Sequence, residues 1–376
     1  MIPFNKPYMT GGELANIAEA YANGHLSGDG PFTKRCHAWL RDNTGAESAL
    51  LTHSCTAALE IAALLLDLVP GDEVIMPSFT FVSTANAFVL RGAVPVFVDI
   101  RPDTLNIDEA LIEAAITDRT RAICVVHYAG VSCEMDSILQ IASRHDLPVI
   151  EDAAQGVMSA YRGRPLGTIG DLGAFSFHET KNIISGEGGA LLCKEDTFAE
   201  RAEIIREKGT NRSRFFRGQV DKYTWVDVGS SFLPGEITAA FLSAQMDAAQ
   251  EITTRRLDLW ARYHAWAEHY EQQGRLRRPV IPEACTHNAH MYYLLLPDLD
   301  SRSRFIALLR EQGIQAVFHY IPLHSSPKGL ESARVNGRLQ VTDSVSERLV
   351  RLPLWVGLED QMERVLDGLD QALLAL

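Results

Sequence analysis

Long hydrophobic runs are missing from this sequence of 376 residues. The longest candidate, Leu59–Val69, is interrupted by Asp67 and followed by Pro70, so it is too short to cross a membrane. The opening residues, MIPFNKPYMTGGE, also lack the charged region and apolar run of a secretory signal. We therefore expect a cytoplasmic protein with no membrane partner.

Positive charge and paired cysteines are also scarce. The formal net charge is −13, which argues against nucleic acid as a main partner. The six cysteines are scattered without a C-x-x-C pair, so we expect reduced thiols and neither a disulfide scaffold nor a metal site. One basic run, residues 206–217 (REKGTNRSRFFR), is a candidate exposed loop for binding a phosphorylated metabolite.

Short apolar strands, by contrast, alternate regularly with helices from residue 49 to residue 152. Continuously apolar strands at this rhythm predict an α/β fold, with a mostly parallel sheet covered by helices on both faces. From Glu236 to Gln272 the sequence is almost entirely helical, and we expect two helices with a bend near residue 250. We place the domain boundary there, with a large cofactor-binding domain over residues 1–250 and a smaller C-terminal α/β domain over residues 251–376.

Two polar side chains follow predicted strands at the edge where such sheets carry their sites. Asp152 ends the strand PVIED, and Lys181 follows the strand AFSF in a loop that contains Gly186 and Gly188. A lysine, a carboxylate and a phosphate-binding helix start together make the layout of a pyridoxal phosphate site, because that cofactor needs an amine, an acid facing its ring nitrogen and donors for its phosphate. On local evidence Lys181 could also be a solvated surface lysine, and Asp152 a turn or helix-cap carboxylate.

The phosphate donors are expected at Ser54-Cys55-Thr56-Ala57, between a strand and a buried helix. Ser54 could equally be a simple helix cap, and both roles are compatible. Three further residues are candidates with plain alternatives. Ser176 could add a hydroxyl or be a small core residue, Gln155 could reach the ring hydroxyl or be an ordinary loop residue, and Phe81 could cover the ring or belong to the core.

Segments spread over nearly the whole chain resemble the nucleotide-sugar aminotransferases of the DegT group, which have the type I aminotransferase fold. The segments are THSCTAALE (52–60), PSFTFVSTANAF (77–88), HYAGVSCEMD (127–136), VIEDAAQ (149–155), FSFHETKN (175–182), GEGGA (186–190) and VFHYIPLH (317–324). Four stretches, the first of them the end of FSFHETKN, look most like the branch that makes TDP-4-amino-4,6-dideoxygalactose for enterobacterial common antigen: HETKN, REKGTNRS (206–213), FFRGQVDKYTW (215–225) and IRPDT (100–104).

The resemblance implies a role for each candidate residue. Lys181 would bind the cofactor covalently and move protons, and Asp152 would hold the pyridine nitrogen. The remaining contacts would be Gln155 to the ring oxygen, Phe81 stacked on the ring, and Thr56, Ala57 and Ser176 on the phosphate.

The resemblance also implies a homodimer with shared active sites, in which residues 229–236 reach into the neighbouring subunit. Family members usually have an asparagine where this chain has Ser231, and the resemblance implies that this residue would contact the phosphate of the cofactor in the neighbouring subunit. The implied reaction transfers an amino group from L-glutamate to C4 of a TDP-linked 4-keto-6-deoxyglucose, giving the amino sugar and 2-oxoglutarate. Alternatives are a UDP-linked keto sugar as substrate, a sugar dehydratase of the same fold, in which a histidine replaces the lysine, and a sensor without catalysis.

Overall fold

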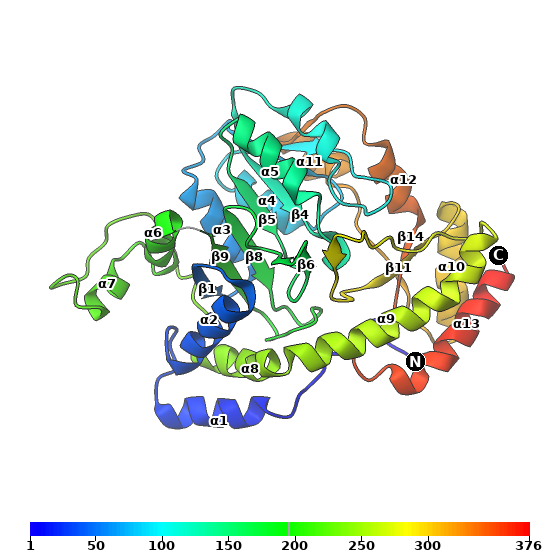
Figure 1. Ribbon diagram of the computed structural model, residues 1–376, viewed down its shortest axis with the longest axis horizontal. Coiled ribbons are helices and arrows are strands. Elements are labelled where there is room, and N and C mark those ends of the chain that lie inside the picture. The colour runs from blue at the N-terminus through cyan, green and yellow to red at the C-terminus, as the bar shows by residue number, and fades with distance from the viewer. Residues whose placement is uncertain (195) are drawn as a thin grey trace.

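The computed structural model describes residues 1–194 and 196–376, and its centre is an eight-stranded sheet (Figure 1). The strand order is β1–β9–β8–β5–β4–β2–β3–β13, and five of the seven neighbouring pairs are parallel. The predicted mostly parallel sheet is therefore confirmed. The strands are β1 (Ser48–Thr52), β2 (Glu73–Pro77), β3 (Val94–Val98), β4 (Thr120–Val126), β5 (Val149–Asp152), β8 (Leu172–Ser176), β9 (Gly189–Cys193) and β13 (Arg334–Val335).

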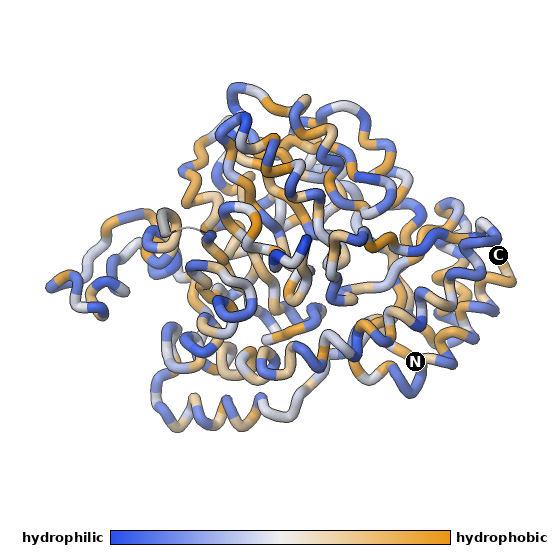
Figure 2. The backbone as a smooth tube through the Cα atoms, in the orientation of Figure 1, coloured by the Kyte–Doolittle hydropathy of each residue, from blue (hydrophilic) through white to orange (hydrophobic). Residues whose placement is uncertain are grey.

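Both faces of the sheet are covered, which explains why its strands are apolar at successive positions. Ile123 and Val125 of β4 belong to one buried core, and Ala122 and Cys124 belong to the other. Figure 2 shows the hydrophobic residues concentrated in this central region. The first core includes residues of α2 (Pro31–Thr44), α5 (Met135–Arg144) and α8 (Glu236–Asp247), and the second includes residues of α3 (Cys55–Leu65), α4 (Val82–Val89) and α6 (Asp196–Arg206).

Strand directions bring distant segments to one edge of the sheet. β5 and β8 are parallel, and β9 is antiparallel to both β8 and β1, so β1 runs in the same direction as β5 and β8. The carboxyl ends of these three strands, and of β2, therefore meet at the same edge. Asp152 is the last residue of β5. Ser54, Phe81 and Lys181 lie within five residues after the ends of β1, β2 and β8, respectively.

The chain beyond residue 236 forms the predicted helix pair and then a second sheet. α8 ends at Asp247 and α9 (Ala249–Gln272) begins two residues later, so the expected bend near residue 250 is confirmed. The second sheet has the order β11–β14–β12, with strands Tyr292–Leu295, Leu349–Leu352 and Val317–Phe318. Helices α10 (Leu299–Glu311) and α13 (Met362–Leu374) pack with it in a separate core. The division into domains at residue 250 stays a prediction.

The remaining elements are short or peripheral. They are α1 (Glu13–Asn23), β6 (Ala160–Tyr161), β7 (Arg164–Pro165), α7 (Arg212–Phe216), β10 (Cys285–Thr286), α11 (Pro327–Ser332), α12 (Gln340–Arg348) and the 3₁₀ turns η1 (Glu109–Leu111), η2 (Glu113–Ala115), η3 (Tyr128–Gly130), η4 (Leu323–Ser325) and η5 (Glu359–Gln361). Within the described part of the chain, no helix is both long and apolar enough to span a bilayer.

The predicted basic loop is only partly exposed. Residues 207–228, which we call the arm, begin at the buried Glu207 and include α7, which stands away from the body of the molecule (Figure 1). Arg206, however, ends α6 and is buried, with its guanidinium on Asp29 at 2.5 Å and on the Leu51 carbonyl at 2.7 Å. The expectation of exposure is wrong for Arg206, because Asp29, 177 positions earlier, provides a carboxylate that the local sequence does not reveal, and it is also wrong for the buried Glu207 and Gly209.

Candidate active site

The loop after β8 places Lys181 close to the start of α3. The Lys181 amide donates to the His178 carbonyl at 2.9 Å, and Gly186, with φ of 80°, lets the chain turn back into β9. At Gly189 a Cβ atom would lie 2.4 Å from the backbone nitrogen of Cys55, so only glycine allows β9 to approach the helix start this closely. The predicted strand, lysine and glycine loop thus pack together against the start of α3.

Asp152 lies at the end of β5 with its carboxylate held from two sides. Its Oδ2 accepts a hydrogen bond from the Thr84 hydroxyl at 2.7 Å, and its Oδ1 accepts from the Ala154 amide at 3.2 Å. Burial raises the pKa of Asp152, an effect that the Thr84 and Ala154 hydrogen bonds and the charge of Lys181 oppose. A cation placed against this carboxylate would offset the burial cost, which is what a protonated ring nitrogen would do.

Lys181 and Asp152 line the same cavity, of about 800 Å³. Burial lowers the pKa of Lys181, and the nearby Asp152 charge only partly opposes that shift. The lowered pKa increases the fraction of free amine at neutral pH, which is the form that reacts with a carbonyl compound. The surface-lysine alternative does not fit a side chain in this position.

The start of α3 forms one wall of the cavity through Ser54, Cys55 and Thr56. Ser54 caps the helix, since its hydroxyl accepts from the Ala57 amide at 3.1 Å. The Thr56 hydroxyl donates to Ser83 Oγ at 2.8 Å, and Ser176 contributes a further hydroxyl to the cavity. Ala57 itself is buried and is not among the cavity-lining residues, and its amide donates to the Ser54 hydroxyl of the cap.

Gln155 and Phe81 also line the cavity. The side-chain Oε1 of Gln155 accepts from the Ala129 amide at 2.7 Å, and its Nε2 donates to the Tyr320 hydroxyl at 3.1 Å, which fixes the side chain. Phe81 stands at the N-terminal boundary of α4 and is 58% exposed, which does not fit a plain core residue. An exposed ring at the mouth of a cavity is free to pack on a flat ligand.

Ser231 lies apart from these residues. It is exposed and forms an isolated backbone bridge with Glu207, and it does not line the cavity of its own chain. Of the eight predicted residues, the structure therefore brings six together: Thr56, Phe81, Asp152, Gln155, Ser176 and Lys181.

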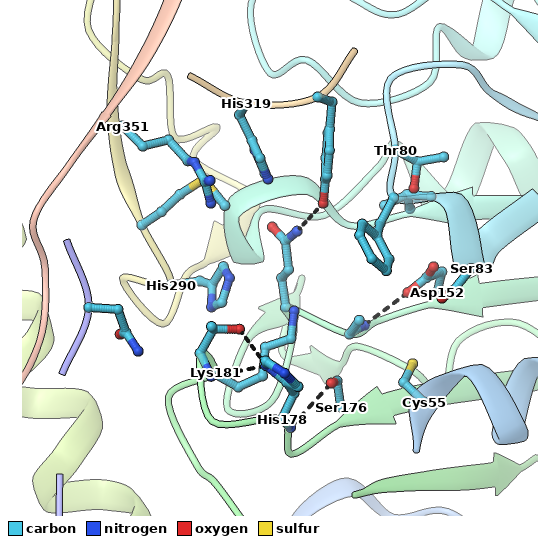
Figure 3. A pocket seen from close by; sticks show the side chains of 18 of the residues that line it. Cys55, Thr80, Ser83, Asp152, Ser176, His178, Lys181, His290, His319 and Arg351 are labelled. Atoms are coloured by element: carbon cyan, nitrogen blue, oxygen red, sulfur yellow. Dashed lines mark hydrogen bonds between the residues drawn. The ribbon is translucent and has the colours of Figure 1, made fainter. Parts of the chain in front are cut away.

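The C-terminal part of the chain supplies cavity residues that the sequence analysis did not single out. His290, His319 and Arg351 line the cavity together with the predicted residues (Figure 3). His319 lies within the quoted segment VFHYIPLH, which was the available signal, whereas nothing local marks Arg351. Burial lowers the pKa of His290 and His319, with smaller contributions from the charges of Lys181 and Arg351.

The donor set fits pyridoxal phosphate. The cavity has a half-buried amine with a lowered pKa, a buried carboxylate that forms no ion pair within the described part of the chain, and hydroxyl groups at a helix start. When bound, the cofactor supplies the carbonyl carbon that receives an amino group and a ring that withdraws electrons from it.

Comparison with known proteins agrees with this interpretation. SpsC, a spore coat polysaccharide biosynthesis protein of Bacillus subtilis, is 35% identical over 336 residues, which are 87% of this chain and 85% of SpsC. The aminotransferase TlmJ from Streptoalloteichus hindustanus superposes with a TM-score of 0.91 at 30% identity, covering 100% of this chain and 99% of TlmJ. The PLP form of the sugar aminotransferase Spr1654 from Streptococcus pneumoniae gives a TM-score of 0.90 at 26% identity, covering 99% and 98%.

The family-level match extends over almost all of the sequence. The pattern of the DegT/DnrJ/EryC1/StrS aminotransferase family matches residues 7–370. The resemblance found in the sequence is confirmed at the family level: this chain belongs to the DegT/DnrJ/EryC1/StrS family and is a pyridoxal phosphate-dependent sugar aminotransferase.

Proposed function

We propose that this enzyme transfers the amino group of L-glutamate to C4 of a TDP-linked 4-keto-6-deoxyglucose. The products are TDP-4-amino-4,6-dideoxygalactose, a sugar of enterobacterial common antigen, and 2-oxoglutarate. The observation that carries the aminotransferase chemistry is the shared cavity of Lys181 and Asp152 beside the start of α3. The choice of sugar rests on the resemblance of residues 100–104, 178–182, 206–213 and 215–225 to one branch of the family.

Each cavity residue has a proposed task. Lys181 Nζ would hold the cofactor covalently until the amine of the donor displaces it, and the freed amine would then take the proton from Cα of the donor and deliver a proton to C4 of the sugar. Asp152 would keep a proton on the ring nitrogen, helped by the hydrogen bond from Thr84. Gln155 would hold the ring oxygen and Phe81 would cover the ring. Thr56 and Ser176 would hold the phosphate, together with Ala57 at the helix start that Ser54 caps.

Ser231 fits a role across a homodimer better than a role in its own subunit. It is exposed on the segment 229–236 that precedes α8, and the adjacent arm exposes the aromatic side chains of Phe216, Tyr223 and Trp225. Solvent-exposed aromatics of this kind are typical of surfaces that another chain covers. We propose that residues 229–236 complete the partner's site.

Two further proposals concern the chain as a whole. The chain divides into domains at residue 250, and the enzyme works in the cytoplasm, where its six free cysteines stay reduced.

The alternatives differ in what they require. A dehydratase of this fold has a histidine in place of the lysine, and this chain has Lys181. A sensor without catalysis does not need a buried amine with a lowered pKa. A 4-aminotransferase for a UDP-linked keto sugar needs the same cavity, so only the choice of nucleotide separates it from our proposal.

One assay separates these functions. The purified holoenzyme is offered TDP- and UDP-linked 4-keto-6-deoxyglucose with L-glutamate, and the sugar product is identified by NMR, with Lys181→Ala as the control for uncatalysed amination. We expect the 4-amino galacto-configured product from the TDP sugar. Amination of the UDP sugar alone would favour that alternative, and elimination without amine transfer would favour the dehydratase.

A further inference from the structure

In the part of the chain that the structure describes, Arg351 has no carboxylate partner, although its side chain lines the active-site cavity. It stands on β14 opposite Val317 of β12, and its Nη2 donates to the Phe318 carbonyl at 3.3 Å. Its guanidinium lies 4.7 Å from the centre of the Phe4 ring. Among the described residues, no carboxylate oxygen lies within 4 Å of it, and its Nε is buried without a hydrogen-bond partner.

The surroundings of Arg351 increase the need for an anion. Burial lowers the pKa of Arg351, so keeping the guanidinium charged costs free energy in the folded chain. The charges of Lys181 and Arg351 add to the effect of burial in lowering the pKa of His290 and His319, which favours uncharged imidazoles beside the two cations. Arg256, also at the cavity, donates to the backbone carbonyls of Ala289 and His290 and likewise has no carboxylate among the described residues. The positive charges of Arg351 and Arg256 at this end of the cavity are therefore not paired with a carboxylate of the described residues.

The carboxylates that line the cavity do not pair with Arg351. The lining residues include two carboxylates, Asp152 and Glu187. Figure 3 shows Arg351 and His290 on one side of Lys181, and Asp152, Ser83 and Cys55 on the other. Glu187 has a side chain that is 71% exposed and faces His178. The cofactor residues thus occupy one side of Lys181, which leaves the Arg351 side for the other reactants.

Two anionic groups enter the proposed reaction besides the cofactor phosphate. The diphosphate of a sugar nucleotide is separated from C4 by most of a hexose ring and carries a bulky nucleoside. The carboxylates of an amino acid lie within three carbons of the reacting Cα. A planar guanidinium inside a small cavity suits a carboxylate, which it can bind with two parallel hydrogen bonds.

We infer that Arg351 is a specificity-determining residue that binds a carboxylate of the amino donor. This inference rests on the proposed function, since it takes a dicarboxylic amino acid as the donor. The bound carboxylate pairs with the guanidinium and supplies the acceptor that Nε lacks among the described residues. It holds the donor so that Lys181 Nζ can reach the proton on Cα.

The test is the first half of the reaction, run with L-glutamate and without any sugar nucleotide. Bleaching of the holoenzyme absorbance is followed in single turnover for the unaltered enzyme, Arg351→Gln and Arg351→Lys. Losing a charge-assisted pair with a carboxylate costs about 1.5–3 kcal/mol, so we expect the half-saturating glutamate concentration to rise about 10- to 100-fold in Arg351→Gln. Arg351→Lys should recover part of this loss because it keeps the charge without the planar fork.

Arg302 provides a matched control. It has a buried Nε without a partner and lies 5.6 Å from the Phe318 ring, but it does not line the cavity. Arg302→Gln should leave the half-saturating glutamate concentration unchanged. Because Arg351→Gln could misfold, circular dichroism and cofactor content of each variant are compared with those of Arg302→Gln.

A second readout does not depend on turnover. Binding of glutarate, a dicarboxylate without an amino group, is measured by calorimetry, and we expect it to weaken at least tenfold in Arg351→Gln. Unchanged glutamate and glutarate affinities in a folded Arg351→Gln would overturn the inference, as would a defect confined to the KM of the sugar nucleotide. Failure to aminate any keto sugar, with these donor results intact, would count against the proposed function and leave the role of Arg351 standing.

Discussion

The arm and the cavity contain arginines in opposite settings. On the arm, Arg212, Arg214 and Arg217 lie 2.8–3.0 Å from the carboxylates of Glu207, Glu200 and Glu203, and all three remain substantially exposed. In the cavity, neither Arg351 nor Arg256 has a carboxylate within 4 Å among the described residues. The density of basic residues in the sequence suggests the arm as the site that binds an anion, whereas the arginines without a carboxylate partner among the described residues lie in the cavity.

The comparison matters because exposed and buried charges have different energetic weight. Water screens the arm pairs, and such pairs contribute about 0–1 kcal/mol each. In the cavity, desolvation shifts the pKa of Lys181, Asp152 and Arg351. A change of one cavity residue should therefore alter chemistry, and a change of one arm residue should alter little within a single subunit.

The largest effect is expected from Lys181→Ala. Losing the amine removes the covalent contact and the proton carrier, so we expect turnover to fall at least about 10³-fold. Steady-state formation of 2-oxoglutarate measures this. Lys208→Ala on the arm, whose side chain is 55% exposed, is the control and should keep normal turnover. Near-normal turnover of Lys181→Ala would show that the reaction does not depend on this cavity.

Asp152→Asn is expected to have the next largest effect. The amide has the size of the carboxylate but cannot hold a positive charge on the ring nitrogen, so we expect kcat to fall about 10²-fold or more. The same variant should also lose cofactor more readily during dialysis, measured by absorbance. Glu187→Gln, at the exposed rim of the cavity, is the comparison and should change kcat much less.

Arg206→Ala tests the one buried arginine of the basic run. Removing it leaves Asp29 without its partner, and we expect a loss of about 3 kcal/mol in the free energy of unfolding, measured in urea. Arg217→Ala, which breaks an exposed pair with Glu203, should lose less than about 1 kcal/mol. Equal losses would contradict the distinction between buried and exposed pairs.

The smallest expected effect concerns pH. Burial disfavours the charged form of Lys181, so in the cofactor-free enzyme its amine should deprotonate below the ordinary lysine value of 10.5. Acetylation with trace acetic anhydride across a pH series, read by peptide mass spectrometry, gives the titration of this one amine. A midpoint at or above 10.5 would show that neighbouring charges outweigh burial.

The sequence predicted the features that depend on local order along the chain. Apolar runs such as Ala122–Val126 specify buried strands, and the positions just after them locate Asp152 and Lys181 at one edge of the sheet. These predictions needed only the direction of parallel strands. The pairing of β1 with β9, which brings the start of α3 beside the lysine loop, follows from the fold.

Contacts between distant segments could not be predicted in this way. Arg351 comes from a strand that reaches the cavity only because α9 and the second sheet fold back toward the large sheet. Arg206 looked exposed because its partner Asp29 lies far away in the sequence. In both cases the missing information was which carboxylate, if any, faces the guanidinium.

The most direct test of the account is to locate the cofactor on the chain. Holoenzyme is reduced with borohydride, which fixes the cofactor on the lysine that holds it, and is then digested and analysed by mass spectrometry. We predict a single labelled lysine, Lys181. As a control, the Asp152→Asn variant is dialysed until it is free of cofactor, and it should carry no label. A label on Lys194, Lys208 or any other lysine in place of Lys181 would contradict the account.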